Sequence, residues 1–392
     1  IVRDLIIGRE NLDIDFLVEG SGHDFAEEFG KEFDAKVDFI DRFSTAKIHV
    51  SLETTIDIAM CRCEYYRKPG ALPDVAPSGL RDDLYRRDFT INALAIRLNP
   101  VGFGELIDFF RGANDLEDRR IRILHTLSFV DDPTRVFRAI RFEGRLGFRM
   151  DDETQHQATI ALQDNMLEKI APERIRNEIE LILKENDPIS IIIRAEEIGL
   201  LKRIHSNIKL NHTFFDPPDL IEVLRQKYFK GRNIKPWRMY LPLLFVNLNE
   251  KNLFKLIEDM NFDSTSEKIL KSTCDNAKVI VSKLDGLGMD DLRDYVPVFS
   301  ALRPETLIFL AILWKDNENL KKVLFKYLDE YMSVSLEING KDLIGLGHKP
   351  SPLFKHAFRE CFFRKLEGTI EGKKQELDFT HKFLVELERE ES

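Results

Sequence analysis

The chain has 392 residues, of which 43% are hydrophobic and 32% are charged, as is typical of globular proteins with buried cores. Its length predicts about two to four domains, because one hydrophobic core rarely serves more than about 300 residues. No apolar run approaches the roughly 20 residues of a membrane helix, which argues against a membrane-spanning protein. The formal net charge of −10 excludes a chain coated in positive charge, although a local basic groove could still bind nucleic acid.

Two further features bound the interpretation. The four cysteines match neither a disulfide framework nor the spacing of a zinc site, so we expect a reducing, cytoplasmic location; they are Cys61, Cys63, Cys274 and Cys361. The sequence begins at Ile1 rather than Met, inside what looks like a continuing motif. We therefore expect further sequence upstream.

Apolar and acidic residues alternate from Leu12 to Phe16, which predicts a half-buried strand after a short helix over residues 2–8. Asp13 and Asp15 then share the solvent face, where two carboxylates repel each other unless a cation lies between them. Mg²⁺ takes oxygen ligands and leaves places for substrate phosphates. One interpretation is a metal platform for nucleotidyl transfer; the other is a solvated acidic face, which Asp-x-Asp alone favours.

A helix is predicted around residues 23–33, and a second alternating strand over 55–59 carries Asp57 on its polar side. If the two strands pair, Asp57 supplies a third carboxylate, as a two-metal site needs, although a lone strand aspartate is more often structural. The proline-rich stretch 65–78 predicts a loop. That loop could be a mobile lid or a plain connector.

The most distinctive run, residues 86–93, reads Arg-Arg-Asp-Phe-Thr-Ile-Asn-Ala. It resembles the Arg-Arg-Asp-x-Thr-x-Asn-Ala motif of class II tRNA nucleotidyltransferases and bacterial poly(A) polymerases, which belong to the polymerase-β-like superfamily. The chain is similar to this family at three further places, residues 2–15, 106–122 and 131–142. Four motifs in order are a specific signal, although the family's usual Gly-Gly pair before Val2 is absent.

The fourth of these motifs also has a physical reading. Asp132-Pro133 predicts a helix start, with Asp132 as cap and proline at the first helical position. Arg135, Arg138 and Arg141 then recur every third residue along one side, where an anion such as a triphosphate or an RNA backbone would neutralise them. The alternatives are a solvated basic face or pairing with acidic residues of the head.

The resemblance implies that Asp132 and Arg135 read the incoming base. Cytosine and adenine both present an amine donor beside a ring-nitrogen acceptor. A carboxylate accepts from the amine and a guanidinium donates to the ring nitrogen, whereas uracil and guanine present the reversed pattern. A capping role for Asp132 competes with base reading, and the sequence leaves both open.

The chain reads as helical beyond Asp152. Six cations and no acidic residue occur between Arg225 and Arg238, with aromatic residues between them. This stretch predicts an RNA-backbone contact, and a basic loop with core aromatics is the alternative. The RNA-binding candidates are Arg225, Lys227, Lys230, Arg232, Lys235 and Arg238.

The resemblance implies an α+β fold. A polymerase-β-like nucleotidyltransferase head, a small mixed sheet with helices, would occupy residues 1–110. An all-helical neck for base recognition (111–190), body (191–300) and tRNA-binding tail (301–392) would follow. No prediction of oligomeric state arises from the sequence.

The resemblance also implies the activity: template-independent addition of C and A to the 3′ end of tRNA from CTP and ATP, with release of pyrophosphate. Two Mg²⁺ ions would be held by Asp13 and Asp15, with Asp57 as a further candidate ligand. The implied nucleotide-binding residues are Arg3, Arg87, Asn92, Asp132, Arg135, Arg138 and Arg141. Alternatives are an enzyme that adds only CC or only A, a poly(A) polymerase, or a non-catalytic RNA-binding protein; the intact proline-rich loop favours an enzyme able to add A.

Overall fold

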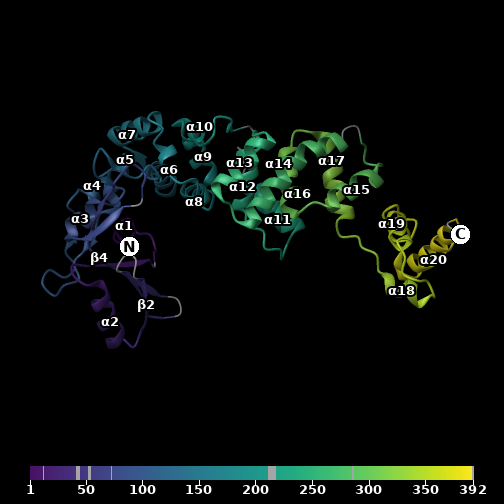
Figure 1. Cartoon of the computed structure of the whole chain (residues 1–392), viewed down its shortest axis with the longest axis horizontal. Coiled ribbons are helices and arrows are strands. Elements are labelled where there is room, and N and C mark those ends of the chain that lie inside the picture. The colour runs from purple at the N-terminus through teal and green to yellow at the C-terminus, as the bar shows by residue number, and fades with distance from the viewer. Residues whose placement is uncertain are drawn as a thin grey trace. The chain divides into compact units, whose positions relative to one another are not determined.

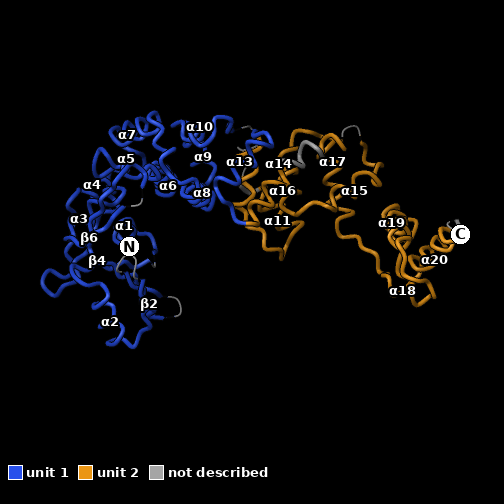
Figure 2. The backbone as a smooth tube through the Cα atoms, viewed as in Figure 1, with its two compact units in different colours: residues 1–214, 247–263 blue, residues 215–246, 264–392 orange. Residues whose placement is uncertain are grey.

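Figure 1 shows a computed structural model of the chain, which describes residues 1–11, 13–40, 45–51, 54–71, 73–210, 218–284 and 287–390. The chain divides into two compact units, coloured separately in Figure 2. Unit 1 comprises residues 1–214 and 247–263, and unit 2 comprises residues 215–246 and 264–392. Each unit is therefore built from two separate stretches of chain.

Unit 1 opens with helix α1 (Val2–Ile6) and a four-stranded mixed sheet. The strands are β1 (Ile14–Val18), β2 (Lys36–Ile40), β3 (Thr45–His49) and β4 (Thr55–Met60), in the order β1-β4-β3-β2. β1 and β4 are parallel, whereas the two other pairs are antiparallel. Parallel neighbours need a crossover connection, which here includes helix α2 (Gly22–Glu32).

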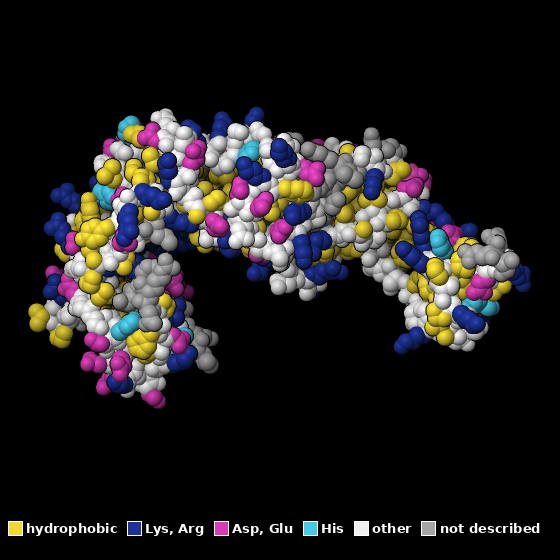
Figure 3. All heavy atoms as spheres, viewed as in Figure 1, with side chains coloured by type: hydrophobic (Ala, Val, Ile, Leu, Met, Phe, Trp, Pro, Cys, Tyr) yellow, Lys and Arg dark blue, Asp and Glu magenta, His cyan; other side chains and the backbone are white. Residues whose placement is uncertain are grey.

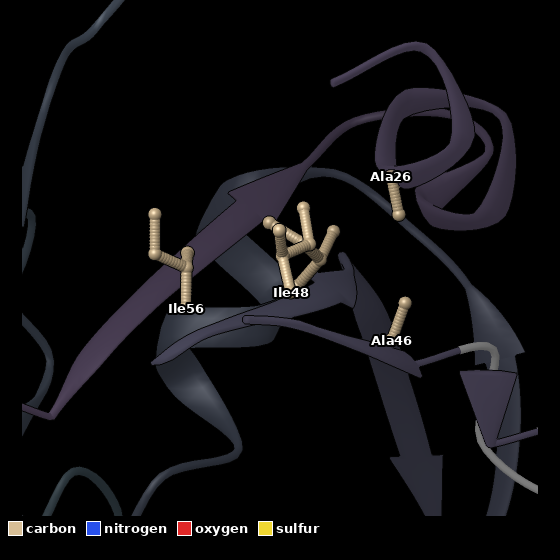
Figure 4. Close-up of a cluster of buried hydrophobic side chains, with 5 residues drawn as sticks. Ala26, Ala46, Ile48 and Ile56 are labelled. Carbon is tan, nitrogen blue, oxygen red and sulfur yellow. The ribbon is translucent and has the colours of Figure 1, made fainter. Parts of the chain in front are cut away.

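Helix α2 covers one face of this sheet. The Ser21 hydroxyl caps the helix by accepting from the backbone N–H of Asp24 at 3.1 Å. Ala26 of the helix packs against the apolar side chains of β3 and β4, as Figure 4 shows; the buried cluster is Ala26, Ala46, Ile48, Ile56 and Ile58. Because strand side chains alternate, the intervening residues of the strands face away from this core.

The strand and helix predictions in this region are confirmed with small shifts. The strand predicted over 55–59 is β4, and the one predicted over 12–16 is β1, which begins at Ile14. Leu12 itself lies outside the described residues. The prediction of one loop over 65–78 is wrong, because β6 (Asp74–Pro77) pairs antiparallel with β5 (Arg62–Tyr65). Pro77 is compatible with this strand because a two-stranded ribbon leaves N–H groups that need no partner.

The remainder of unit 1 is mostly helical. Short elements follow the sheet: α3 (Leu80–Tyr85), η2 (Thr90–Asn92), β7 (Ala95–Ile96), β8 (Leu106–Ile107), α4 (Gly112–Glu117), β9 (Arg120–Ile121) and β10 (Arg149–Met150). Its further helices are α5 (Ser128–Asp131), α6 (Arg135–Leu146), α7 (Asp152–Gln163), η3 (Met166–Lys169), α8 (Pro172–Leu183), α9 (Pro188–Glu197), α10 (Leu200–Ile204) and α13 (Glu250–Met260). Gly144 lets α6 approach α9, since a Cβ there would lie 2.3 Å from Ile191 Cγ1.

The secondary-structure elements that the structure describes in unit 2 are all helical. Its elements are α11 (Pro218–Tyr228), α12 (Trp237–Phe245), α14 (Ser264–Leu284), α15 (Leu292–Ser300), α16 (Pro304–Leu313), α17 (Glu318–Lys326), the π-helical turn η5 (Tyr327–Tyr331), α18 (Gly340–Gly345), α19 (Leu353–Leu366) and α20 (Gly372–Glu390). Phe245, Phe299 and Phe309 are fully buried in it. None of the helices that the structure describes is both long enough and apolar enough to span a membrane.

The predicted fold class is confirmed: a small mixed sheet near the N-terminus is followed by helices. The division into head, neck, body and tail at residues 110, 190 and 300 stays a prediction. Cys61, Cys63 and Cys361 are free, and the side chain of Cys274 lies outside the described part of the chain.

Candidate active site

The acidic residues singled out in the sequence lie on the sheet face opposite α2. In the strand register, Asp15 of β1 is paired with Asp57 of β4, which is paired with Lys47 of β3. Lys47 Nζ lies 3.2 Å from Asp57 Oδ1. Asp13 directly precedes β1, and its backbone N–H donates to Asn11 Oδ1 at 2.8 Å. The structure therefore brings the predicted carboxylates together and adds a lysine beside them.

The electrostatics of Asp15 favour a bound cation. Partial burial raises the pKa of Asp15, and the nearby negative charges of Asp57 and Asp13 raise it further, while Arg87 lowers it. No group of three or more His, Cys, Asp or Glu side chains among the described residues could hold a metal ion alone. Carboxylate oxygens completed by substrate phosphates suit Mg²⁺, so the donor set fits that ion.

Three of the predicted nucleotide-binding residues meet near these carboxylates. Arg3 Nη1 donates to Asn92 Oδ1 at 2.7 Å, and Arg87 Nη1 donates to the backbone carbonyl of Asn92 at 3.3 Å. Arg87 Nη2 also reaches the buried Asp83 at 3.4 Å. Asp83, to which the sequence analysis gave no role, thus holds Arg87 in place. The spacing of four residues between Asp83 and Arg87 could have indicated this ion pair, because side chains four residues apart lie next to each other along a helix.

Asp88 is a second residue that the sequence analysis missed. Its Oδ2 accepts from Arg138 Nε at 2.8 Å, and its Oδ1 accepts from Asn92 Nδ2 at 2.9 Å. Burial raises the pKa of Asp88, but the charge of Arg138 and these hydrogen bonds outweigh burial and lower it below the usual range. Asp88 therefore stays ionised and links α6 to the segment that carries Arg87.

The pair predicted to read the base already has protein partners. Arg135 is buried; its Nη1 donates to Ser128 Oγ at 2.7 Å and its Nη2 to the carbonyl of Arg86 at 2.6 Å. Arg174 Nη2 donates to both oxygens of Asp132, at 2.8 and 2.9 Å. Arg174 lies in α8, more than 40 residues from Asp132 in sequence, so no local pattern could have identified it.

The predicted helix start at Asp132-Pro133 is wrong by two residues. Helix α6 begins at Arg135, and its N-cap residue, Thr134, makes no side-chain capping bond. Asp132 nevertheless accepts from the Thr134 backbone N–H at 3.0 Å. The Asp132 carboxylate thus contacts Thr134 and Arg174 and does not cap the first turn of α6.

Arg174 also reaches the proline-rich connection between β5 and β6. Its Nη1 donates to the Gly70 carbonyl at 3.1 Å, and the Gly70 N–H donates to the Asp131 carbonyl at 3.3 Å. Gly70 has φ +70° and lies so close to Lys169 that a Cβ would be 2.8 Å from its carbonyl oxygen. This turn therefore lies directly against the segment that carries Asp132.

Arg141 lies deeper in the helical part of unit 1. It is 5% exposed and pairs with Glu178 at 3.5 Å and Glu185 at 3.6 Å. Burial lowers the pKa of Arg141 and raises that of Glu178. These pairs match the alternative in which arginines of α6 pair with acidic residues, although the partners come from α8 and the turn after it, and a nucleotide contact for Arg141 stays a prediction.

Arg135 lines a pocket of about 400 Å³. The pocket also includes Glu64 and Tyr66 from the β5–β6 region, Tyr85 at the end of α3, and His125. The His125 and Tyr85 rings lie 5.1 Å apart, and burial lowers the pKa of His125, which favours its neutral form. The pocket is therefore lined by aromatic and polar groups suited to a planar base.

The six predicted RNA-binding residues divide into two groups in unit 2. Arg225 pairs with Glu222, Lys227 with Asp329, and Arg238 donates to Ser266 Oγ at 3.2 Å. The other three are exposed on the segment between α11 and α12, and their side chains have no hydrogen-bond or ion-pair partner among the described residues; they are Lys230, Arg232 and Lys235. Figure 3 shows Lys and Arg side chains gathered near α11.

Comparison with protein families agrees with this geometry. A family model described as "Poly A polymerase head domain" matches residues 1–122, and one described as "Probable RNA and SrmB- binding site of polymerase A" matches residues 147–210. These matches indicate a head domain of the poly(A) polymerase type, followed by a helical part that is similar to the RNA-binding region of such polymerases.

Relatives that match most of the chain identify the family more closely. An A-adding tRNA nucleotidyltransferase of Geobacter sulfurreducens is 34% identical over 96% of this chain and 43% of the relative. One of Halalkalibacterium halodurans is 33% identical over 97% of this chain and 87% of the relative. The chain belongs to the tRNA nucleotidyltransferase family, whose members are enzymes, and the resemblance inferred from four motifs is confirmed. The chain spans less than half of the Geobacter relative.

Solved structures give the same result. The apo form II of a CCA-adding enzyme has a TM-score of 0.81 and 32% identity, covering 96% of this chain and 88% of that one. A tRNA nucleotidyltransferase complexed with a primer tRNA and an incoming ATP analogue has a TM-score of 0.67 and 29% identity, covering 84% of this chain and 92% of that one.

Proposed function

We propose that the protein extends the 3′ end of tRNA without a nucleic-acid template, and that addition of the terminal A from ATP is its main reaction. The observation that carries this proposal is the carboxylate group of Asp13, just before β1, and Asp15 of β1, which lies beside Arg3, Arg87 and Asn92. Similarity over nearly the whole chain to relatives named as A-adding enzymes supports the choice of nucleotide.

In this proposal Asp13 and Asp15 hold two Mg²⁺ ions, and Asp57 is a candidate further ligand. Mg²⁺ bound there would lower the pKa of the attacking 3′-hydroxyl and neutralise the leaving pyrophosphate. Arg3 and Arg87 bind the triphosphate, and Asn92, fixed by hydrogen bonds to Arg3 and Asp88, contacts the ribose. Asp88 keeps Arg138 beside this group.

Asp132 and Arg135 select the base in this proposal. The carboxylate accepts from the exocyclic amine of adenine or cytosine and the guanidinium donates to the ring nitrogen. Uracil and guanine would face like partners there, which costs a few kcal/mol in a desolvated site. Arg174 and Ser128 hold the two side chains before the nucleotide arrives, so little reorganisation is needed.

Complete CCA addition is the second candidate. The similar fold of a CCA-adding enzyme over 96% of this chain favours it. The two candidates differ only in whether CTP is used on a tRNA that lacks its CC.

The test uses three tRNAs, ending before CCA, after the first C and after CC, each with labelled CTP or ATP. Addition of A to the third tRNA alone supports the A-adding proposal, and addition to all three supports the CCA alternative. If none is labelled, the proposed function is wrong. The cytoplasmic location expected from the cysteines stays a prediction.

A further inference from the structure

Lys47 stands beside the carboxylates but belongs to none of the motifs that predicted the site. The strand register places Asp15, Asp57, Lys47 and Asp38 in one row across the four strands. Lys47 is the only cation of this row, which lies on the face that α2 leaves uncovered. The side chains of Lys47 and Asp57 are 41% and 53% exposed, so a bound substrate can reach both.

The carboxylates have two flanks, the edge of the sheet at β1, where Asp15 lies, and the β3 side, where Lys47 lies. Arg87 acts on Asp15, whereas Lys47 pairs with Asp57 at 3.2 Å. Asp57 separates Lys47 from Asp15 in the row, and with strands about 4.8 Å apart the backbone of Lys47 lies about 10 Å from that of Asp15. A lysine side chain spans much of this distance, so its ammonium group can approach a substrate held over the carboxylates.

The chemistry of the proposed reaction gives the two flanks different tasks. Attacking and leaving oxygens lie roughly in line on opposite sides of the transferred phosphorus. If Arg3 and Arg87 hold the pyrophosphate end of the nucleotide, the RNA end must approach from the other flank. The phosphodiester next to the attacking 3′-hydroxyl would then meet Lys47, a compact charge suited to a phosphate oxygen.

We infer that Lys47 binds the backbone of the last nucleotides of the tRNA and positions the 3′-hydroxyl, an inference that rests on the proposed function. In the free protein Lys47 is held by Asp57, and this pair opens toward the phosphate when the RNA end enters. Lys47 is thus a tRNA-binding residue of β3, distinct from the triphosphate-binding arginines.

The binding test compares tRNA ending in CC with the same tRNA trimmed of both C residues, using fluorescence anisotropy in EDTA. Lys47→Met should lower the affinity for the CC-ending tRNA about tenfold, as expected for the loss of one charged hydrogen bond. The affinity for the trimmed tRNA should stay unchanged. Lys47→Arg should restore most of the difference. Lys36→Met is the matched control, because Lys36 is an exposed lysine of the same sheet paired with Asp38 at 2.8 Å, and it should change neither affinity.

The kinetic test asks which substrate is affected. Lys47→Met should raise the KM for tRNA about tenfold while the KM for ATP stays within about twofold. A rise in the KM for ATP, or a change only in the Mg²⁺ concentration needed for half-maximal rate, would overturn the inference, as would behaviour equal to wild type. If wild type itself adds no nucleotide, the proposed function fails instead, and the binding comparison still decides whether Lys47 contacts the RNA end.

Discussion

At the scale of single residues, the site combines a carboxylate whose ionised form the protein disfavours with one whose ionised form the protein stabilises. Asp15 is the clearest case, because its surroundings disfavour the ionised carboxylate that metal binding needs. Asp88 is the opposite case, since Arg138 and Asn92 stabilise its charge. The first carboxylate is ready for a cation, whereas the second is already satisfied by the protein.

Asp15→Asn is expected to abolish nucleotide addition and to stabilise the metal-free protein. Loss of several kcal/mol of metal-assisted catalysis corresponds to a rate decrease of about 10³-fold, while tRNA binding should stay near normal. With a raised pKa in the folded state, the wild-type carboxyl contributes stability below its unfolded pKa that is lost as pH rises through the folded pKa. In EDTA at neutral pH the variant should therefore melt at a higher temperature, and this advantage should vanish at acidic pH.

Asp38→Asn is the control for that experiment. Asp38 lies in the same row of the sheet, but hydrogen bonds from Lys36 and His49 lower its pKa. Its replacement should leave nucleotide addition unchanged and bring no gain in melting temperature. Unchanged addition by Asp15→Asn would contradict the metal assignment.

Arg174→Ala is expected to reduce nucleotide selection. Without the two bonds from Arg174, the Asp132 carboxylate keeps its hydrogen bonds from Thr134 but is held less firmly, so a charged hydrogen bond of about 1.5–3 kcal/mol to the base is lost in part. We expect kcat/KM for ATP to fall about 10- to 100-fold and the preference for ATP over UTP to shrink.

Arg176→Ala provides the comparison for Arg174. Arg176 lies in the same helix, but its Nη1 donates to the Met260 carbonyl in α13 at 3.1 Å, away from Asp132. Its loss should lower the melting temperature and leave the ATP-to-UTP ratio intact. An unaltered ratio in Arg174→Ala would exclude the positioning role of Arg174.

Short motifs in the sequence indicated candidate residues that the structure brings near one another, such as Asp15, Arg87 and Asn92. It could not predict Arg174 or Lys47, because their partners Asp132 and Asp57 come from other elements. Nor could it show that Arg135 and Arg141 are buried, since their three-residue spacing equally suits an exposed basic face. Pairing between distant side chains is decided by tertiary structure, which periodicity does not encode.

At the scale of elements, predictions succeeded where periodicity was strong and failed where competing local bonds decided the boundary. Alternation predicted β4 almost to the residue. The start of α6 was misplaced because Asp132 accepts from Thr134 and Arg174 rather than capping the first turn. The β5–β6 ribbon was missed because the three prolines and one glycine of residues 65–78 favour a loop by composition.

The segment between α11 and α12 is expected to contribute to tRNA affinity through phosphate contacts. Replacing its exposed cations Lys230, Arg232 and Lys235 by Ala should lower the slope of log affinity against log salt by about 2, because each phosphate contact contributes about 0.7–0.9. Titrations of tRNA at four or five salt concentrations measure this slope.

Arg225 and Lys227 serve as a comparison in the same region. Glu222 and Asp329 already neutralise them, so the Arg225→Ala, Lys227→Ala double variant should change the slope less than the triple variant does. An equal or larger change would show that pairing in the free protein does not predict which cations meet RNA.

At the scale of the whole molecule, the net charge of −10 limits non-specific attraction to RNA. Binding of RNA then depends on local groups of cations. The proposed catalytic groups lie in unit 1, and the exposed cations between α11 and α12 lie in unit 2. The sequence alone indicated that a sheet comes first and helices follow. It did not indicate that each unit is built from two separate stretches of chain.

Helix α13 has a consequence for biosynthesis. It belongs to unit 1, where Arg176 of α8 donates a hydrogen bond to its last residue, yet it begins 36 residues after the first stretch of that unit ends at residue 214. At roughly 5–20 residues per second, the ribosome needs about 2–10 s to proceed from residue 214 to residue 263. During this interval the nascent unit 1 lacks one of its helices, and the side of α8 that α13 covers in the folded protein is exposed.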